Sequence, residues 1–208
     1  MRVSVVIPAK NEAASLPALL EGLNALEEVV EIIVVNDGST DDTSDVCKRQ
    51  GVREVKHPYS KGNGAAIKSG VRAATSDILL FMDADGQHRP EDIPGLLAKM
   101  SEGYDMVVGA RHSSSQASVG RLIANGFYNK LSSWMVDQKI EDLTSGFRVV
   151  KAEKFRRFLY LLPNGFSYPT TSTMAFFRAG FSVGYHPFTA QQRVGKSHIN
   201  YFKDGIRF

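Results

Sequence analysis

Two carboxylates one residue apart have the types and spacing best suited to chemistry in this sequence. Asp83 and Asp85 follow an apolar run and precede Gly86. Residues i and i+2 of an extended segment point the same way, so both side chains can converge on one cation. Two hard oxygen ligands suit Mg²⁺ or Mn²⁺, which keep other positions for water and substrate phosphates. The alternative is a pair of turn carboxylates, since Asp-Gly is also a common turn.

The apolar run before these carboxylates predicts the element that positions them. Five apolar residues in a row, from Ile78 to Met82, indicate a strand buried on both faces, as in a parallel sheet covered by helices. In open α/β sheets, ligands bind beyond the carboxyl ends of the strands. We therefore expect a binding site at that edge of a sheet.

Strand and helix patterns alternate through the first half of the chain. Strands are expected near 3–7, 31–35, 52–57, 78–82 and 105–109, with helices at 13–26, 42–50, up to about 74, and from 90 to about 100. The second half is less regular, with helices expected at 120–136, 154–162 and 170–179, and strands ending near 150 and 188. No linker or repeat divides the chain, so we expect one α/β domain over residues 1–208, with a mostly parallel central sheet flanked by helices.

The overall composition excludes several classes of protein. The 208 residues are 43% hydrophobic and 23% charged, which is typical of a globular domain. A formal charge of +3 is too small to predict nucleic-acid binding. The single cysteine, Cys47, excludes an intrachain disulfide and a cysteine-rich zinc site. No stretch approaches the roughly 20 apolar residues that span a bilayer, and the first apolar run is too short for a signal peptide, so we expect a soluble or peripheral protein.

Polar turns after the other early strands are expected at the same edge of the sheet. One turn follows Pro8, and a second, 36–43, holds Asp37 ahead of residues that could cap a helix. A glycine-rich turn from Lys61 onward could present backbone N–H groups to an anion, or could be a simple tight entry to a helix. Asp37 precedes the cap, so it is the residue of its turn best placed to face a ligand.

Six segments in this order resemble the family 2 glycosyltransferases. They are VVIPAKNE (5–12), VNDGSTDDT (35–43), KGNGAAIKSG (61–70), MDADGQH (82–88), DLTSGFR (142–148) and RVGKSH (193–198). Within this family the order is similar to the branch of dolichyl-phosphate mannosyltransferases and polyprenyl-phosphate glycosyltransferases. The resemblance implies a GT-A fold and an inverting, metal-dependent transfer of a hexose from a GDP- or UDP-hexose, with Mn²⁺ or Mg²⁺ as cofactor.

The resemblance also implies roles for individual residues. Asp37 would meet the base or ribose, Asp83 and Asp85 would hold the metal, and Gln87 would lie against the sugar or the metal shell. The residues implied to bind the nucleotide sugar are Pro8, Ala9, Asn11, Glu12, Asp37, Lys61, Gly62, Asp83, Ala84, Asp85 and Gln87. Those implied to be catalytic are Asp85, Arg111, Asp142, Arg193 and Lys196.

The acceptor decides whether a base is needed. Departure of a nucleoside diphosphate develops negative charge, which a divalent ion and nearby Arg or Lys stabilise without proton transfer. A hydroxyl acceptor must lose a proton, which would make Asp142, or else Glu141, a general base. A polyprenyl or dolichyl phosphate, the acceptor implied by the resemblance, is already anionic. Asp142 would then orient Arg148 or the acceptor site, and the phosphate would be recognised by Arg111, Arg121, Arg193 and Lys196.

Other interpretations of these residues stay open. Asp142 could cap a turn with Thr144 and Ser145, and Arg148 could be a salt-bridge partner beside a short strand. A sugar nucleotidyltransferase shares the fold type but needs a glycine-rich loop after the first strand, and a haloacid dehalogenase-type phosphatase needs Thr or Val where Gln87 stands. A non-catalytic sugar-nucleotide binding module also stays open. The histidines at 88, 112 and 198 lack zinc-type spacing and are expected to be polar loop residues.

The C-terminal segment, 192–208, is basic and amphipathic. Ile199, Phe202 and Ile206 follow helical spacing beside Lys203 and Arg207, which suits a helix on a membrane surface, or one packed on its own domain or on a partner. Many lipid-phosphate relatives continue from this point into membrane helices. We therefore expect a chain that is either truncated or peripherally attached, located in the cytoplasm at the cytoplasmic face of a membrane.

Overall fold

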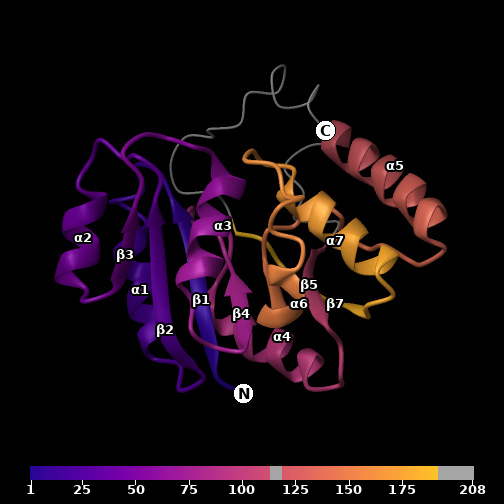
Figure 1. Ribbon diagram of the computed structural model, residues 1–208, viewed down its shortest axis with the longest axis horizontal. Coiled ribbons are helices and arrows are strands. Elements are labelled where there is room, and N and C mark those ends of the chain that lie inside the picture. Colours follow the sequence, from indigo (N-terminus) through magenta and orange to yellow (C-terminus); the bar gives the residue numbers. More distant parts are fainter. Residues whose placement is uncertain (113–118, 192–208) are drawn as a thin grey trace.

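A seven-stranded sheet forms the centre of the described structure (Figure 1). The structure is a computed structural model that describes residues 1–112 and 119–191, and for 119–125 and 127 it describes the backbone alone. The strands lie in the order β3-β2-β1-β4-β6-β5-β7. Their bounds are β1 Val3–Ala9, β2 Val29–Asn36, β3 Arg53–Lys56, β4 Ile78–Phe81, β5 Met106–Arg111, β6 Arg148–Lys151 and β7 Val183–Phe188.

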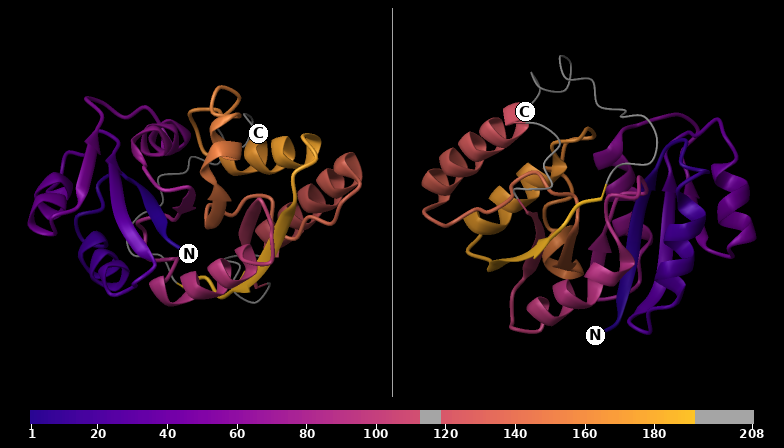
Figure 2. Two further views of the ribbon diagram at one scale, coloured as in Figure 1. Left: turned by 60° about the horizontal axis from the view of Figure 1, so that its bottom comes forward. Right: turned by 180° about the vertical axis from the view of Figure 1, so that it is seen from behind.

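Helices cover both faces of the sheet (Figure 2). One apolar cluster joins α1, α2 and α4 to Val5 and Leu80, and the other joins α3, α6 and α7 to Val6 and Leu79. Neighbouring residues of a strand thus enter opposite layers, which explains why these strands are apolar throughout. The helices are α1 Leu16–Asn24, α2 Thr43–Arg49, α3 Asn63–Ala73, α4 Ile93–Met100 after the 3₁₀ turn Pro90–Asp92, α5 Val119–Val136, α6 Ala152–Arg156 and α7 Tyr168–Arg178.

Strand directions confirm the mostly parallel sheet and show one reversal. β1 runs parallel to β2 and β4, β2 to β3, and β5 to β7, whereas β6 is antiparallel to both β4 and β5. Arg148, the first residue of β6, therefore pairs with Phe81 near the end of β4 and with Val108 of β5. The loop before β6 consequently reaches the same edge as the loops after β1, β4 and β5.

The helix expected over 154–162 is present but shorter, and its bounds are wrong. Helix α6 ends at Arg156, and the chain then turns so that residues 163–165 pack against the start of α3. Gly64 N and Ala65 N of α3 donate to the carbonyl oxygens of Gly165 and Asn164, both at 3.1 Å. These backbones approach so closely that a Cβ on Gly64 would lie 2.1 Å from the carbonyl oxygen of Pro163. Strand β4 also ends one residue earlier than expected, at Phe81.

The two edge strands of the sheet, β3 and β7, differ in their structure. β3 is only four residues long and begins and ends with the exposed residues Arg53 and Lys56. β7 pairs with β5 on one side and includes Pro187, opposite Ala110. Proline has no backbone N–H and therefore cannot complete a regular ladder on the strand's other side. Across 1–112 and 119–191, no helix combines the length and apolar character needed to cross a bilayer.

Gly70 of α3 provides a test of the packing between helix and sheet. A Cβ at this position would lie 2.2 Å from Val6 Cγ1 of β1 and 3.1 Å from Val35 Cγ2 of β2. We expect Gly70→Ala to lower the free energy of unfolding by about 1–3 kcal/mol through overpacking, measured by denaturant titration. Gly126→Ala in α5 is the matched control, because nothing lies within 4 Å of its added Cβ, and it should be neutral or stabilising. Equal losses in the two variants would contradict this account.

Candidate active site

The loops after β1, β2, β4 and β5 and the loop before β6 meet at one edge of the sheet. Most of the residues expected to form a site lie there, distributed over these five loops. Pro8 and Ala9 are the last two residues of β1, and the buried Ala84 lies between the two carboxylates that follow β4. The antiparallel β6 brings Asp142 to the same edge as Asp83, although 59 positions separate the two residues in the chain.

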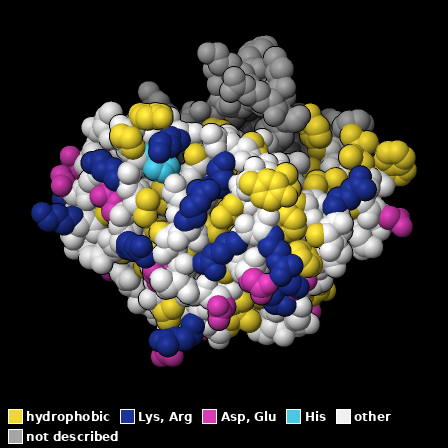
Figure 3. Space-filling model, viewed as in Figure 1, with side chains coloured by type: hydrophobic (Ala, Val, Ile, Leu, Met, Phe, Trp, Pro, Cys, Tyr) yellow, Lys and Arg dark blue, Asp and Glu magenta, His cyan; other side chains and the backbone are white. Residues whose placement is uncertain are grey.

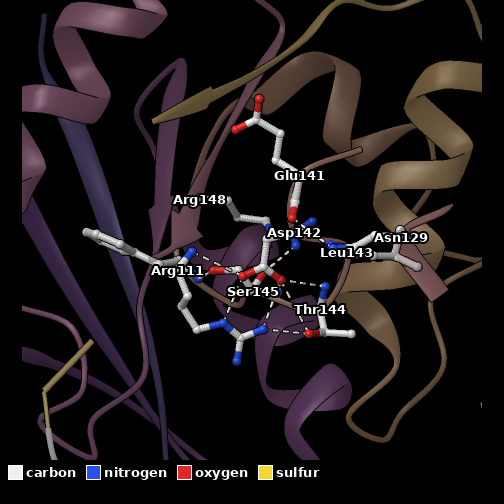
Figure 4. A network of polar contacts seen from close by, with 9 residues as sticks. Arg111, Asn129, Glu141, Asp142, Leu143, Thr144, Ser145 and Arg148 are labelled. Atoms are coloured by element: carbon white, nitrogen blue, oxygen red, sulfur yellow. Dashed lines mark hydrogen bonds and ion pairs between the residues drawn. The ribbon is translucent and has the colours of Figure 1, made fainter. Parts of the chain in front are cut away.

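Arg111 and Asp142 form a fork-to-fork ion pair at this edge (Figure 4). Arg111 Nε donates to Asp142 Oδ2 and Nη2 donates to Oδ1, both at 2.8 Å. The backbone N–H of Arg111 also donates to Oδ2, at 3.2 Å. Nη2 reaches Thr144 Oγ1 at 2.6 Å as well. The guanidinium is thus held in one orientation, while 29% of the Arg111 side chain stays exposed to a ligand.

Asp142 accepts hydrogen bonds from its own turn in addition to Arg111. The backbone N–H groups of Thr144 and Ser145 donate to Oδ1, each at 3.1 Å, so the expected turn cap is present. Burial alone would raise the pKa of Asp142, but the hydrogen bonds and charge of Arg111 and the backbone donors hold this pKa below its ordinary value. A carboxylate stabilised this strongly in its charged form is a weak proton acceptor and a good anchor for a cation.

The Asp142 loop also lies against Asp83. A Cβ on Gly146 would be 3.1 Å from Asp83 Oδ2, so the glycine permits a close approach of the two loops. The electrostatics of Arg111 show the same proximity. Burial alone would lower the pKa of Arg111, but the hydrogen bond and charge of Asp142, and then the charge of Asp83, raise it above its ordinary value. The acidic pair after β4 and the Arg111–Asp142 pair therefore belong to one site.

His88 supports the segment that carries the two acidic residues. Its Nδ1 accepts the backbone N–H of Asp83 at 3.0 Å. Its ring stacks on Phe147 with centroids 4.8 Å apart and meets the edge of Phe188 at 5.6 Å. Burial lowers the pKa of His88 to about 4, so the imidazole is neutral at physiological pH and can accept this bond. His88 is thus a buried support, whereas the sequence suggested a polar loop residue.

The donor set after β4 fits a divalent cation that also binds substrate. Asp85 is buried, and its Oδ1 accepts the backbone N–H of Gln87 at 3.1 Å, which fixes the carboxylate within its own turn. A carboxylate has about four lone-pair positions, so it can accept this hydrogen bond and also bind a metal. Among the described residues no group of three or more His, Cys, Asp or Glu could hold an ion. A metal at Asp83 and Asp85 would therefore need oxygen ligands from a substrate and from water, as Mg²⁺ and Mn²⁺ commonly have.

Arg148 differs from both roles expected for it. It is fully buried, and in the described chain its partners are neutral: the Ser145 and Pro169 carbonyl oxygens, Ser172 Oγ at 2.8 Å and Thr173 Oγ1 at 3.1 Å. It is therefore no salt-bridge partner, and the residue that Asp142 orients is Arg111. Burial lowers the pKa of Arg148, and the nearby hydroxyls and carboxylates only partly offset that effect. The side chain fixes the Ser145 peptide to the start of α7.

Asp37 is enclosed by its neighbours in this structure. One carboxylate oxygen accepts the N–H of Lys61 at 2.8 Å and contacts His57 Nδ1 at 2.7 Å. The other accepts the Gly62 N–H at 2.9 Å and the Ser60 hydroxyl at 2.8 Å. Burial would raise the pKa of Asp37, but these four bonds lower it. Four N–H groups of the glycine-rich turn are thus directed to Asp37 and to residues 164–165, and not outward to an anion.

The loops after β1 and β2 are joined by side-chain hydrogen bonds. Asn11, which has a positive φ of 56°, accepts the Thr40 N–H on its Oδ1 at 2.8 Å and donates its own N–H to Ser39 Oγ at 2.9 Å. Glu12 donates its N–H to Thr43 Oγ1 at 3.1 Å and accepts the Ser15 hydroxyl at 2.6 Å. Asn11 and Glu12 therefore help to shape the wall of the site formed by these two loops.

Three of the basic residues named from the sequence lie outside the structural description. Arg193 and Lys196 are beyond the described residues, and the side chain of Arg121 is not described. The last described residue, Gln191, donates its backbone N–H to the Gln87 carbonyl oxygen at 3.2 Å. The C-terminal segment therefore departs from a point beside the acidic turn after β4.

Three supporting residues carried no recognisable signal in the sequence. His57 links Asp37 to Ser69, at 2.7 and 2.9 Å. His88 seats the backbone of Asp83, and Asn129 of α5 bonds to the backbone on both sides of Asp142. The contacts of His57 and Asn129 join segments that are at least 12 residues apart in the chain, whereas His88 and Asp83 lie in the same loop. Only His88, which lies inside one of the six segments, had a position that could have suggested a role.

Comparisons with known proteins identify the family of the chain. Residues 4–159 match the sequence model described as glycosyl transferase family 2. The chain is 39% identical over 140 residues to the undecaprenyl-phosphate 4-deoxy-4-formamido-L-arabinose transferase of Klebsiella pneumoniae, covering 62% of this chain and 42% of that protein. It is 32% identical to an uncharacterized protein of Methanocaldococcus jannaschii over 165 residues, covering 76% and 68%. The chain thus spans less than half the length of the Klebsiella relative.

Solved structures confirm the expected GT-A fold. The glucosyl-3-phosphoglycerate synthase of Mycobacterium tuberculosis, in complex with Mn²⁺, UDP and glucosyl-3-phosphoglycerate, superposes with a TM-score of 0.74 at 22% identity. The superposition covers 94% of this chain and 73% of the synthase. At this identity the likeness establishes the fold alone. The family match over three quarters of the sequence, with the named polyprenyl-phosphate relative, shows that this chain belongs to glycosyl transferase family 2.

Proposed function

We propose that this chain transfers a hexose from a nucleoside diphosphate sugar to a polyprenyl phosphate, with inversion at the anomeric carbon. The observation that carries the choice of acceptor is the state of Asp142, which is engaged by Arg111 and by two backbone N–H groups and has a lowered pKa. A hydroxyl acceptor needs a base, whereas a phosphate acceptor is already a nucleophile. The name of the Klebsiella relative, an undecaprenyl-phosphate transferase, supports the same acceptor class.

The donor would bind across the loops after β1, β2 and β4. Its base and ribose fit the wall formed by Asn11, Glu12 and the Asp37 turn, and its diphosphate would reach Asp83 and Asp85, with Gln87 toward the sugar. A divalent ion bound by these carboxylates would neutralise the charge that develops on the leaving diphosphate. Mn²⁺ and UDP in the synthase structure support a metal of this kind.

The acceptor phosphate would be bound by Arg111. Asp142 and Thr144 hold Nε and Nη2 of this residue, so its guanidinium meets the phosphate in a fixed orientation without reorganising. One direct displacement by a phosphate oxygen inverts the anomeric carbon and involves no protein base. Asp142 is thus a positioning residue, and Arg193 and Lys196 would supply further positive charge. Reaction with such a lipid would place the protein at the cytoplasmic face of a membrane.

The direct test combines donor sugars with two kinds of acceptor. GDP- and UDP-hexoses would be incubated with Mn²⁺ or Mg²⁺ and either undecaprenyl phosphate or simple saccharides, and glycolipid, glycoside and free nucleoside diphosphate would be measured. We expect glycolipid from at least one donor. Transfer to saccharide hydroxyls alone would favour the alternative in which Asp142 is a base, and nucleoside diphosphate release without any transfer would contradict the proposal.

Asp85→Asn tests the metal site. We expect wild-type affinity for the nucleoside diphosphate to fall when EDTA removes the metal, because the carboxylates and the diphosphate share the ion. Asp85→Asn should bind equally weakly with and without Mn²⁺, measured by calorimetry, and turnover should be abolished. Asp92→Asn is the matched control, since Asp92 pairs with Arg89 in the neighbouring 3₁₀ turn. A metal-dependent affinity retained in Asp85→Asn would refute the assignment.

Asp142→Asn tests whether the charged pair between Asp142 and Arg111 supports turnover. The folded-state pKa of Asp142 is lowered, so the charged pair is fully present above the ordinary Asp value of about 3.9 and is lost only as the pH falls through the lowered pKa. We expect kcat/KM to fall roughly 100-fold in the variant through misplacement of Arg111. The ratio of wild type to variant should be constant from about pH 5.5 to 8. A ratio that rises with pH across this range would mean that Asp142 loses its proton there, which would contradict the lowered pKa.

A further inference from the structure

Helix α5 turns a polar face toward the protein. Asn129 Nδ2 donates to the Glu141 carbonyl oxygen at 2.8 Å, and Asn129 Oδ1 accepts the Leu143 N–H at 3.0 Å. One turn further on, Ser133 Oγ accepts the Ile140 N–H at 2.9 Å, and Ser132 is buried beside it. The inward side of α5 therefore holds the backbone on both sides of Asp142 (Figure 4).

The outward side of α5 is apolar and exposed. Tyr128, Leu131, Trp134 and Met135 are each at least 42% exposed, and Trp134 is 80% exposed. At 100° per residue these four positions fall within an arc of about 120°, opposite the buried side of the helix. They account for four of the nine large exposed hydrophobic residues found in the described chain. Figure 3 shows hydrophobic side chains along the α5 end of the molecule. We call these four residues the α5 face.

The charge of α5 favours one kind of partner for the α5 face. The sequence of α5, VGRLIANGFYNKLSSWMV, holds two basic residues and no Asp or Glu, and Lys130 is exposed beside the arc. Asp137 follows the helix, and Lys139 is paired with Glu141, so these residues after α5 offset only one of its two positive charges. The segment 192–208 holds four Lys or Arg against one Asp, and so does not complement α5. Helix α5 and the segment 192–208 are both positively charged, so each is complementary to a negatively charged surface.

We propose that the α5 face docks on an anionic lipid bilayer. The aromatic rings of Tyr128 and Trp134 would lie at the level of the head groups, Leu131 and Met135 would reach the acyl boundary, and Lys130 would meet lipid phosphates. The consequence for the acceptor rests on the proposed function: the inward side of the same helix holds the Asp142 loop, so docking would bring Arg111 to the surface where a lipid phosphate emerges. The membrane contact itself requires no turnover.

The protein supplies its own reporter for this contact. Trp134 is the only tryptophan of the chain, so its fluorescence reports on the α5 face alone. The full chain would be mixed with vesicles of phosphatidylcholine, with or without phosphatidylglycerol. We expect a blue shift of the emission and quenching by brominated acyl chains when phosphatidylglycerol is present, with weaker effects on phosphatidylcholine and at high salt.

A variant that keeps the reporter tests the surface itself. The double substitution Leu131→Ser and Met135→Ser should weaken vesicle binding roughly tenfold or more in a flotation assay, because it removes apolar area from the contact. Tyr160→Ser is the matched control, since Tyr160 is 81% exposed but lies outside α5, and its binding should be unchanged. Circular dichroism spectra would verify that both variants fold.

Three outcomes would overturn the inference. The first is a Trp134 emission that no vesicle changes, and the second is an equal response to neutral and anionic vesicles. The third is a concentration-dependent blue shift without lipid that the double substitution abolishes. This third outcome would indicate contact between two copies of the chain. Failure of the proposed function is distinguishable. Vesicle binding without glycolipid synthesis would refute only the acceptor, and full glycolipid synthesis on vesicles by the double variant would refute only the α5 face.

Discussion

Because β6 runs antiparallel between β4 and β5, the loop that precedes it reaches the edge where the parallel strands end. That reversal sets Asp142 beside Arg111 and Gly146 beside Asp83, although these residues come from three separate parts of the chain. A parallel strand in the same place would have sent this loop to the opposite edge. The chemistry proposed for the site, in which carboxylates bind a cation and an oriented arginine binds an anion, thus depends on the direction of one four-residue strand.

Holding that loop in place requires burying charge. Arg148 is fully enclosed by neutral acceptors, which is costly unless its hydrogen bonds are well formed. Its bonds to the Ser145 carbonyl oxygen fix the residue whose own N–H donates to Asp142. Asp142 in turn fixes Arg111, which keeps part of its surface exposed. A chain of polar contacts therefore runs from the start of α7 to the ligand-accessible edge, and each member limits the movement of the next.

Local sequence patterns predicted the elements of the fold and the first residues of the site. The apolar run at 78–82 indicated a buried strand, and the polar turns after the early strands indicated a shared edge, which the structure confirms. The pattern at 154–162 failed because the 163–165 segment packs against the start of α3, a contact between distant parts of the chain. Arg148 was misread for the same reason, since its neutral acceptors on α7 lie more than 20 residues away. Pairs such as His57 with Asp37 have no fixed spacing, so one sequence does not reveal them.

The outer strands of the sheet have a consequence for self-association. An exposed strand edge is a template for a strand from another molecule, and proteins often block it with short strands, lysine or proline. Here β3 is short and carries Arg53 and Lys56, and β7 carries Pro187. Neither border of the sheet therefore favours extension by a neighbouring copy. At high density on a two-dimensional surface, blocked edges of this kind would prevent aggregation by strand pairing between molecules.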